Sequence, residues 1–68
     1  TDILTITSGA PHQIIEQVAL LDASGKILVL KHPRQANIQL MLADVPPGLY
    51  TIQTKIEGRF MGEQVVKH

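Results

Sequence analysis

The 68-residue sequence contains no cysteine and no tryptophan, and it has a single tyrosine and a single phenylalanine. Without cysteine, neither a disulfide bond nor a thiolate metal site can stabilise the domain, and the redox compartment stays open. The scarcity of aromatic rings weakens the case for sugar binding, because such sites on small β domains generally rely on exposed rings. We therefore expect Tyr50 to be a core residue whose hydroxyl bonds a backbone group, while the exposure of Phe60 stays open.

The sequence also lacks an excess of charge of either sign and a long apolar run. Six basic and six acidic residues are mixed along the chain and give a formal net charge of zero. Nucleic-acid binding normally needs a basic excess or a basic face, so we expect no nucleic-acid partner. No apolar run approaches the roughly 18 residues that cross a bilayer, and no signal-peptide pattern occurs.

Residues equipped for chemistry are scarce and isolated. The histidines have no metal-ligand spacing, the aspartates precede or lie in turns, and the serines lie in turns without a base placed to activate them. These residues are His12, His32, His68, Asp2, Asp22, Asp44, Ser8 and Ser24. The glycines are separate turn glycines rather than a phosphate-binding loop. We therefore predict that the domain is not an enzyme and holds no metal or cofactor.

Strand patterns, by contrast, repeat from end to end. Alternating or continuous apolar segments cover residues 2–7, 14–22, 26–31, 37–42, 50–56 and 59–66. Short strands at this spacing predict an all-β fold, a small immunoglobulin-like antiparallel β-sandwich of six to seven strands in one domain. One alternative stays open, a helix over residues 12–23, because Ile14, Val18 and Leu21 lie four and three positions apart.

The turns between these segments are well specified. Residues 22–25 have the order of a type I turn, with Asp22 first and Gly25 in positive φ. Pro47 and Gly48 fit the central positions of a type II turn. Residues 57–58, which include Gly58, form a plausible two-residue hairpin loop. Gly62 is expected to mark a bulge or kink in the last strand.

Five stretches follow one another along the chain: LTI at 4–6, VALLDASGKIL at 18–28, IQL at 38–40, VPPGLYTIQ at 45–53 and VVKH at 65–68. Their order resembles the C-terminal sorting domain of cargo proteins exported by the type IX (Por) secretion system. That family has an opening strand, a D-x-x-G-[KR] turn after an aliphatic strand, an I-x-L strand, a hydrophobic–x–x–G–x–Y turn and a basic residue in the last strand. The matching residues are Asp22, Gly25, Lys26, Val45, Gly48, Tyr50, Val65, Val66 and Lys67.

The family often has a P-N-P-like stretch before the first strand, and none precedes Thr1 here. Since the chain also starts without Met and enters a strand at once, we expect it to be one sorting domain, residues 1–68, from a longer precursor.

The resemblance implies a non-catalytic secretion signal, attached to a cargo that can itself be an enzyme. Its partners would be the type IX translocon, the outer-membrane shuttle components, a sortase-like peptidase and the cargo domain upstream. Its location would be the periplasm in transit, then the outer membrane, cell surface or medium. The alternative is an immunoglobulin-like accessory module of a secreted enzyme or adhesin, which binds carbohydrate or spaces domains.

Recognition by the translocon is expected to use the last strand, with Val65, Val66 and Lys67. If this strand lies at a sheet edge, its unpaired backbone groups can bind a partner strand. Deletion of residues 65–68 is then expected to abolish export while most of the sandwich stays folded; if the two valines merely complete the core, the deletion unfolds the domain. Exposed edges also predict weak or strand-exchanged homodimers of the isolated domain.

Overall fold

The computed structural model describes residues 3–10 and 12–68, which form six β-strands and no helix. The strands are β1 Ile3–Thr7, β2 Ile15–Leu21, β3 Ile27–Lys31, β4 Asn37–Met41, β5 Gly48–Ile56 and β6 Arg59–Lys67. All six expected strands are confirmed, and the helix over residues 12–23 is wrong because β2 occupies this segment. The described residues therefore contain no helix long and apolar enough to cross a membrane.

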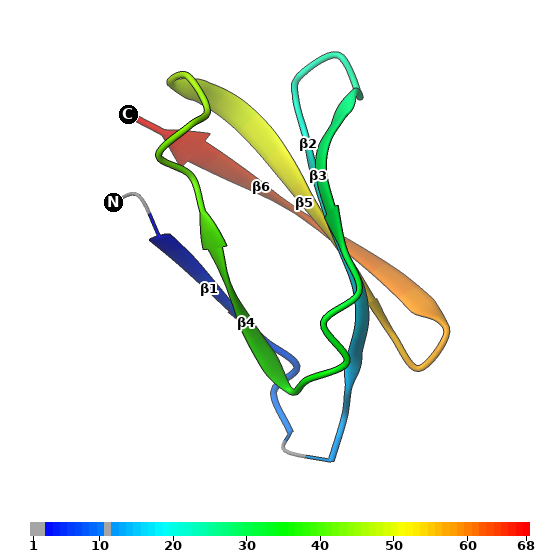
Figure 1. Ribbon diagram of the computed structural model, residues 1–68. Coiled ribbons are helices and arrows are strands. Elements are labelled where there is room, and N and C mark those ends of the chain that lie inside the picture. Colours follow the sequence, from blue (N-terminus) through cyan, green and yellow to red (C-terminus); the bar gives the residue numbers. More distant parts are fainter. Residues whose placement is uncertain (1–2, 11) are drawn as a thin grey trace.

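The strands form two antiparallel sheets that make a small β-sandwich (Figure 1). The smaller sheet contains β1 and β4, and the larger sheet has the order β3–β2–β5–β6. This confirms the predicted fold class, with six strands.

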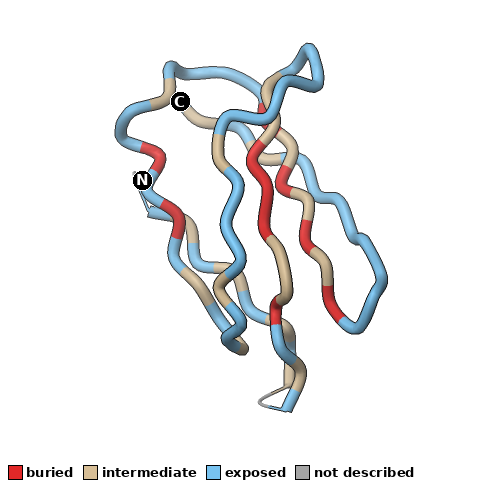
Figure 2. Tube along the Cα trace, turned by 45° about the vertical axis from the view of Figure 1, so that its right-hand side comes forward, coloured by how far each residue is buried: buried red, intermediate tan, exposed pale blue. Residues whose placement is uncertain are grey.

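Apolar side chains on the facing sides of the sheets form the core. Along β5, Tyr50, Ile52, Thr54 and Ile56 are buried while the residues between them are only half-buried, as period-two alternation requires. Figure 2 shows buried positions recurring along neighbouring strands. The buried cluster comprises Ile15, Val18, Leu20, Leu40, Leu42, Tyr50, Ile52 and Ile56. Full burial of each large aliphatic side chain contributes about 1.5–3 kcal/mol, which makes this cluster the main stabilising feature.

A β-bulge interrupts the period-two alternation near the start of β2. Ile15 pairs with Ile56 of β5 and Gln17 pairs with Lys55, so Glu16 is the extra residue. The bulge allows Ile15 and Val18, three positions apart, to be buried in the same core. The Glu16 carboxylate accepts a hydrogen bond from the N–H of Gly58 (2.8 Å), so the bulged residue also contacts the β5–β6 turn.

β6 lies at an edge of the larger sheet, a position that the sequence had left open. Its register with β5 runs without a shift from Gly48, opposite Lys67, to Ile56, opposite Arg59. Gly62 pairs with Gln53 within this ladder, so the bulge expected at Gly62 is wrong.

Two of the three predicted turns have the expected geometry. The N–H of Gly25 bonds the carbonyl of Asp22 (3.0 Å), and Gly25 has a φ of 90°. Glu57 and Gly58 have φ values of 51° and 76°, and positive φ at both positions is the signature of the type I′ turn that suits hairpins.

Candidate functional site

Three sequence elements that are far apart in the chain lie at one end of the sandwich. The register places Leu21, the last residue of β2, beside Thr51, and Thr51 beside Gln64. The β2–β3 turn at residues 22–26, the β4–β5 loop at residues 42–48 and the end of β6 at residues 65–67 therefore extend in the same direction (Figure 1). We call this region the motif end, because it contains most of the predicted site residues. Gly58 lies in the β5–β6 turn at the opposite end of the two strands.

The β4–β5 loop differs from the sequence prediction. Its hydrogen-bonded turn runs from Leu42 to Val45, where the N–H of Val45 bonds the carbonyl of Leu42 (3.2 Å). Gly48 is the first residue of β5 and pairs with Lys67, and its φ of 158° is far from the value near 80° that a type II turn requires. The type II turn predicted at Pro47–Gly48 is therefore wrong. The positive φ expected of Gly48 is present, in a region of backbone space that is essentially restricted to glycine.

Lys67, at the end of β6, stabilises this loop through its side chain. Its half-buried side chain extends to the loop, and Nζ donates hydrogen bonds to the carbonyl oxygens of Leu42 (2.5 Å) and Val45 (2.6 Å), with Ala43 further away (3.5 Å). Hydrogen bonds from a charged donor are roughly twice as strong as neutral ones. The ammonium group that the resemblance assigns to recognition is thus bound within the domain.

Tyr50 fixes the same loop from the core. The ring is buried, and its hydroxyl donates a hydrogen bond to the carbonyl of Pro46. This confirms the prediction of a core tyrosine bonded to the backbone. With 5% of its surface exposed, the ring offers no platform for a sugar.

The two valines before Lys67 have different environments. Val65 is half-buried and packs against the core cluster, whereas Val66 is 60% exposed and faces away from the core. Its partner in the β5–β6 ladder is Leu49, which is 44% exposed, so the two form an apolar pair on the outer face of the larger sheet. Of the three residues predicted for recognition, Val66 is the one with a free side chain.

The turn at residues 22–26 is organised by the carboxylate of Asp22. One of its oxygens accepts hydrogen bonds from the Ser24 hydroxyl (2.6 Å), the Ser24 N–H (2.9 Å) and the Lys26 N–H (3.0 Å). The Ser24 hydroxyl, followed by the Lys26 N–H, lowers the pKa of Asp22 below its ordinary value of 3.8. Gly25 and Lys26 are exposed, so the turn presents a compact, polar surface beside the loop.

The groups that could perform catalysis are separated or used in turns. The Ser8 hydroxyl donates to the carbonyl of Ala10 (2.7 Å), and the Ser24 hydroxyl donates to Asp22. Within residues 3–10 and 12–68, no three His, Asp or Glu side chains come together in a group that could hold a metal ion. His12, His32 and His68 are all exposed.

The chain matches no protein-family model, no curated protein and no solved structure. Function must therefore be argued from the motif end itself. Sequence reasoning found most of its residues but not the contact between Lys67 and the loop carbonyls, which joins residues more than 20 positions apart. The one sequence signal for this contact was a basic residue after two valines. That pattern is equally consistent with an exposed lysine that binds a partner.

Proposed function

We propose that this domain is a non-catalytic sorting signal for the type IX secretion system. It would direct an attached cargo protein across the outer membrane, after which a sortase-like peptidase would remove the domain from many cargoes. The observation that supports the proposal is the gathering of three motifs at the motif end. The turn at residues 22–26, the loop at residues 42–48 and the end of β6 are separated in the sequence, but they form one surface of the fold.

The contacts divide the motif residues into two groups with different tasks. Tyr50, Gly48 and Lys67 set the shape of the loop from within. Val66, Gly25 and Lys26 are exposed and belong to the accessible surface of the motif end. A signal shared by many unrelated cargoes is suited to this design, because a fixed shape with a few exposed side chains can be recognised whatever protein precedes it.

The free edge of β6 adds a second means of recognition. β6 pairs with β5 on one side and lies at the edge of the sheet, so its backbone can accept a strand of the shuttle or translocon. The exposed Val66 would then contribute side-chain contact next to this edge.

A reporter fusion tests the proposal directly. The 68 residues are joined through a flexible linker to an inert periplasmic protein, in a host with the type IX system. We expect the reporter at the cell surface or in the medium, and its loss from there when the translocon is disabled. A reporter that stays in the periplasm with a folded domain would refute the sorting function, and would favour the accessory-module alternative.

A substitution at Val66 tests recognition more sharply than a deletion. Removal of residues 65–68 would also remove Val65 from the core and Lys67 from the loop, so loss of export could reflect unfolding. Val66→Ser changes an exposed side chain, and we expect it to reduce export of the reporter at least about 5-fold while leaving the free energy of unfolding in urea within about 0.5 kcal/mol of wild type. Phe60→Ser is the matched control, because Phe60 is 55% exposed at the other end of β6. Equal export of Val66→Ser and Phe60→Ser would exclude a recognition role for Val66.

A further inference from the structure

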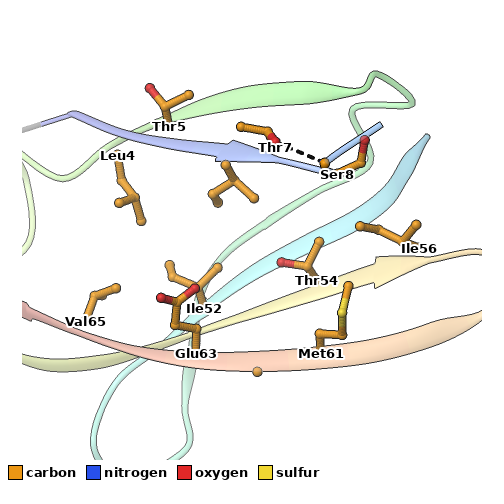
Figure 3. A pocket seen from close by; sticks show the side chains of 13 residues that line it. Leu4, Thr5, Thr7, Ser8, Ile52, Thr54, Ile56, Met61, Glu63 and Val65 are labelled. Carbon is orange, nitrogen blue, oxygen red and sulfur yellow. Dashed lines mark hydrogen bonds between the residues drawn. The ribbon is translucent and has the colours of Figure 1, made fainter. Parts of the chain in front are cut away.

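A groove of about 590 Å³ opens between β1 and β6, along one side of the sandwich (Figure 3). It exists because the two-stranded sheet covers part of the inner face of the four-stranded sheet and leaves the part next to β6 open. Met61 of β6 has its side chain on this inner face and is nevertheless 53% exposed. The sandwich is thus incompletely closed on this side.

The two sides of the groove have different characters. On β1 and the turn after it, consecutive residues from Leu4 to Gly9 line the groove, which means that it runs along the edge of this strand. On β5 the lining residues are alternate ones, Ile52, Thr54 and Ile56, which means that the groove lies over the face of this strand. The groove therefore lies beside the edge of β1 and over the face of β5. This is the position that a third strand of the smaller sheet would occupy.

The edge of β1 offers backbone groups for such a strand. The N–H of Ser8 bonds the carbonyl of Ala36, its partner on the β4 side. Because backbone groups alternate in direction along an antiparallel strand, those of Thr5 and Thr7 point away from β4. These two residues present two N–H and two C=O groups to an added strand.

The face below this edge is apolar and carries one charge. Its floor contains Ile52 and Ile56, and Val65 and Met61 rise beside it, as Figure 3 shows. The side chain of Glu63 points into the groove between Val65 and Met61. Of the described residues that line the groove, Glu63 alone is charged.

We propose that this groove accepts an extended segment of a partner protein as the third strand of the smaller sheet. Every second side chain of the segment faces the floor, so it carries alternating apolar residues, with a Lys or Arg opposite Glu63. The result is a sandwich of four and three strands, the arrangement of the smallest immunoglobulin-type domains. Backbone pairing with Thr5 and Thr7 supplies general affinity, and the floor and Glu63 supply selectivity.

The proposal rests on the groove and not on the sorting function. The groove and the motif end share Val65 but are otherwise built from different residues, so each can be tested by variants that leave the other unchanged.

A designed peptide serves as the probe. A fluorescein-labelled Thr-Val-Thr-Lys-Thr-Val-Thr peptide with an amidated C-terminus places Val, Lys and Val on one face in either direction, and seven residues span the groove, which is about 17 Å long from Leu4 to Gly9. The reversed-charge peptide carries Glu in place of Lys, and a scrambled peptide breaks the alternation. Binding to the 68-residue domain is measured by fluorescence anisotropy at low salt.

We expect the Lys peptide to bind up to about 5-fold more tightly than the Glu peptide, since one exposed ion pair contributes up to about that factor. Glu63→Lys is expected to reverse this preference. Gln64→Lys, on the opposite face of β6, is the matched control and is expected to keep the wild-type preference. Failure of the Lys peptide to bind better than the scrambled one would overturn the proposal, and an unchanged preference in Glu63→Lys would overturn the role of Glu63.

Amide hydrogen exchange locates the added strand. Saturating Lys peptide is expected to slow exchange at the N–H groups of Thr5 and Thr7 at least about 10-fold, because both become hydrogen-bonded. Protection along β6 instead would place the peptide on the wrong edge and overturn the proposal. Light scattering should show a monomer; a dimer in which Thr5 and Thr7 are protected would assign the groove to a second copy of this chain rather than to a partner.

Discussion

The two ends of β5 are held in different ways. At the Gly48 end, the preceding loop is fixed by side chains from distant parts of the chain: the Lys67 ammonium bonds Leu42 and Val45, and the Tyr50 hydroxyl bonds Pro46. At the Ile56 end, a two-residue turn with positive φ leads directly into β6, and one long-range hydrogen bond from Gly58 to Glu16 accompanies it.

The first end therefore depends on tertiary contacts, whereas the second depends mainly on local conformation. The turn at residues 57–58 has its geometry because the register of β5 and β6 leaves two residues to close the hairpin. The loop at residues 42–48 contains two prolines, and its carbonyl groups depend on a lysine that follows more than 20 residues later. We therefore expect large losses of stability from substitutions at the first end of β5 and small ones at the second.

Removal of the Lys67 ammonium is expected to have the largest effect. Lys67→Met keeps the aliphatic stem but removes the charged donor from the carbonyl groups of Leu42 and Val45, which leaves the Leu42 carbonyl with only the Val45 N–H. Since hydrogen bonds to charged groups contribute about 1.5–3 kcal/mol, the free energy of unfolding should fall by about 2 kcal/mol in urea denaturation.

Lys55→Met is the control for this experiment. The ammonium of Lys55 lies over the Phe60 ring at 5.5 Å, on the outer face near the other end of β5. A cation–π contact at an exposed site contributes about 0.5 kcal/mol, so the loss should be correspondingly small. Equal losses of unfolding free energy in Lys67→Met and Lys55→Met would contradict the proposed difference between the two ends of β5.

Substitution of Gly48 is expected to cause the next largest loss of stability. A Cβ there would meet the Tyr50 ring at an ordinary contact distance of 3.9 Å, so a side chain would not be crowded. The strain would come from the backbone, because the φ of 158° is one that side-chain-bearing residues rarely adopt. We expect Gly48→Val to destabilise the domain by more than about 1 kcal/mol, because a β-branched residue resists this conformation. Gly62→Ala is the matched substitution, since Gly62 lies in β6 with no atom within 4 Å of an added Cβ. An unchanged urea midpoint for Gly48→Val would contradict the prediction.

At the opposite end of β5, substitutions in the two-residue turn are expected to change stability through the backbone preference of the new residue. Glu57 has a φ of 51°, which asparagine tolerates better than glutamate. Glu57→Asn should raise the free energy of unfolding by about 0.5 kcal/mol, measured in urea, and Glu57→Val should lower it by about 1 kcal/mol. A loss of stability in Glu57→Asn would mean that the turn depends on more than its own two residues.

The smallest effect is a pH dependence at the β2–β3 turn. The pKa of Asp22 is lower in the folded state than its ordinary value of 3.8, so its contribution to stability is complete above pH 3.8 and is lost as pH falls through the folded pKa. Thermal unfolding should therefore show a decrease in Tm below pH 3.8 that is smaller in Asp22→Asn. Identical acid profiles would exclude Asp22 as a contributor.

The sequence predicted strands and local turns well, because these depend on neighbouring residues. Alternation in residues 50–56 identified β5, and the two-residue spacer before Arg59 identified its hairpin. Each of the six strands begins and ends within two residues of its predicted position.

The errors arose where distant residues decide the structure. Pro47–Gly48 has the composition of a type II turn, but pairing of Gly48 with Lys67 extends β5 through this position. Gly62 suggested a bulge, yet the register with β5 is regular there, and the actual bulge at Glu16 has no glycine to mark it. At the motif end, the sequence identified Lys67 and Tyr50 but could not show that both contact one loop.

The pairing of β1 with β4 has a consequence for the order of folding. The ladder joins Ile3 to Met41 and Thr7 to Asn37, whereas β2 with β3 and β5 with β6 are hairpins closed by short turns. Because closing a long loop costs more entropy, we expect the two hairpins to form first, and the β1–β4 and β2–β5 pairings, which each join residues at least 30 positions apart, to follow. During that interval the whole inner face of β5 is uncovered. The nascent domain therefore passes through a stage at which a chaperone, or a strand from a neighbouring chain, competes with β1 for its place.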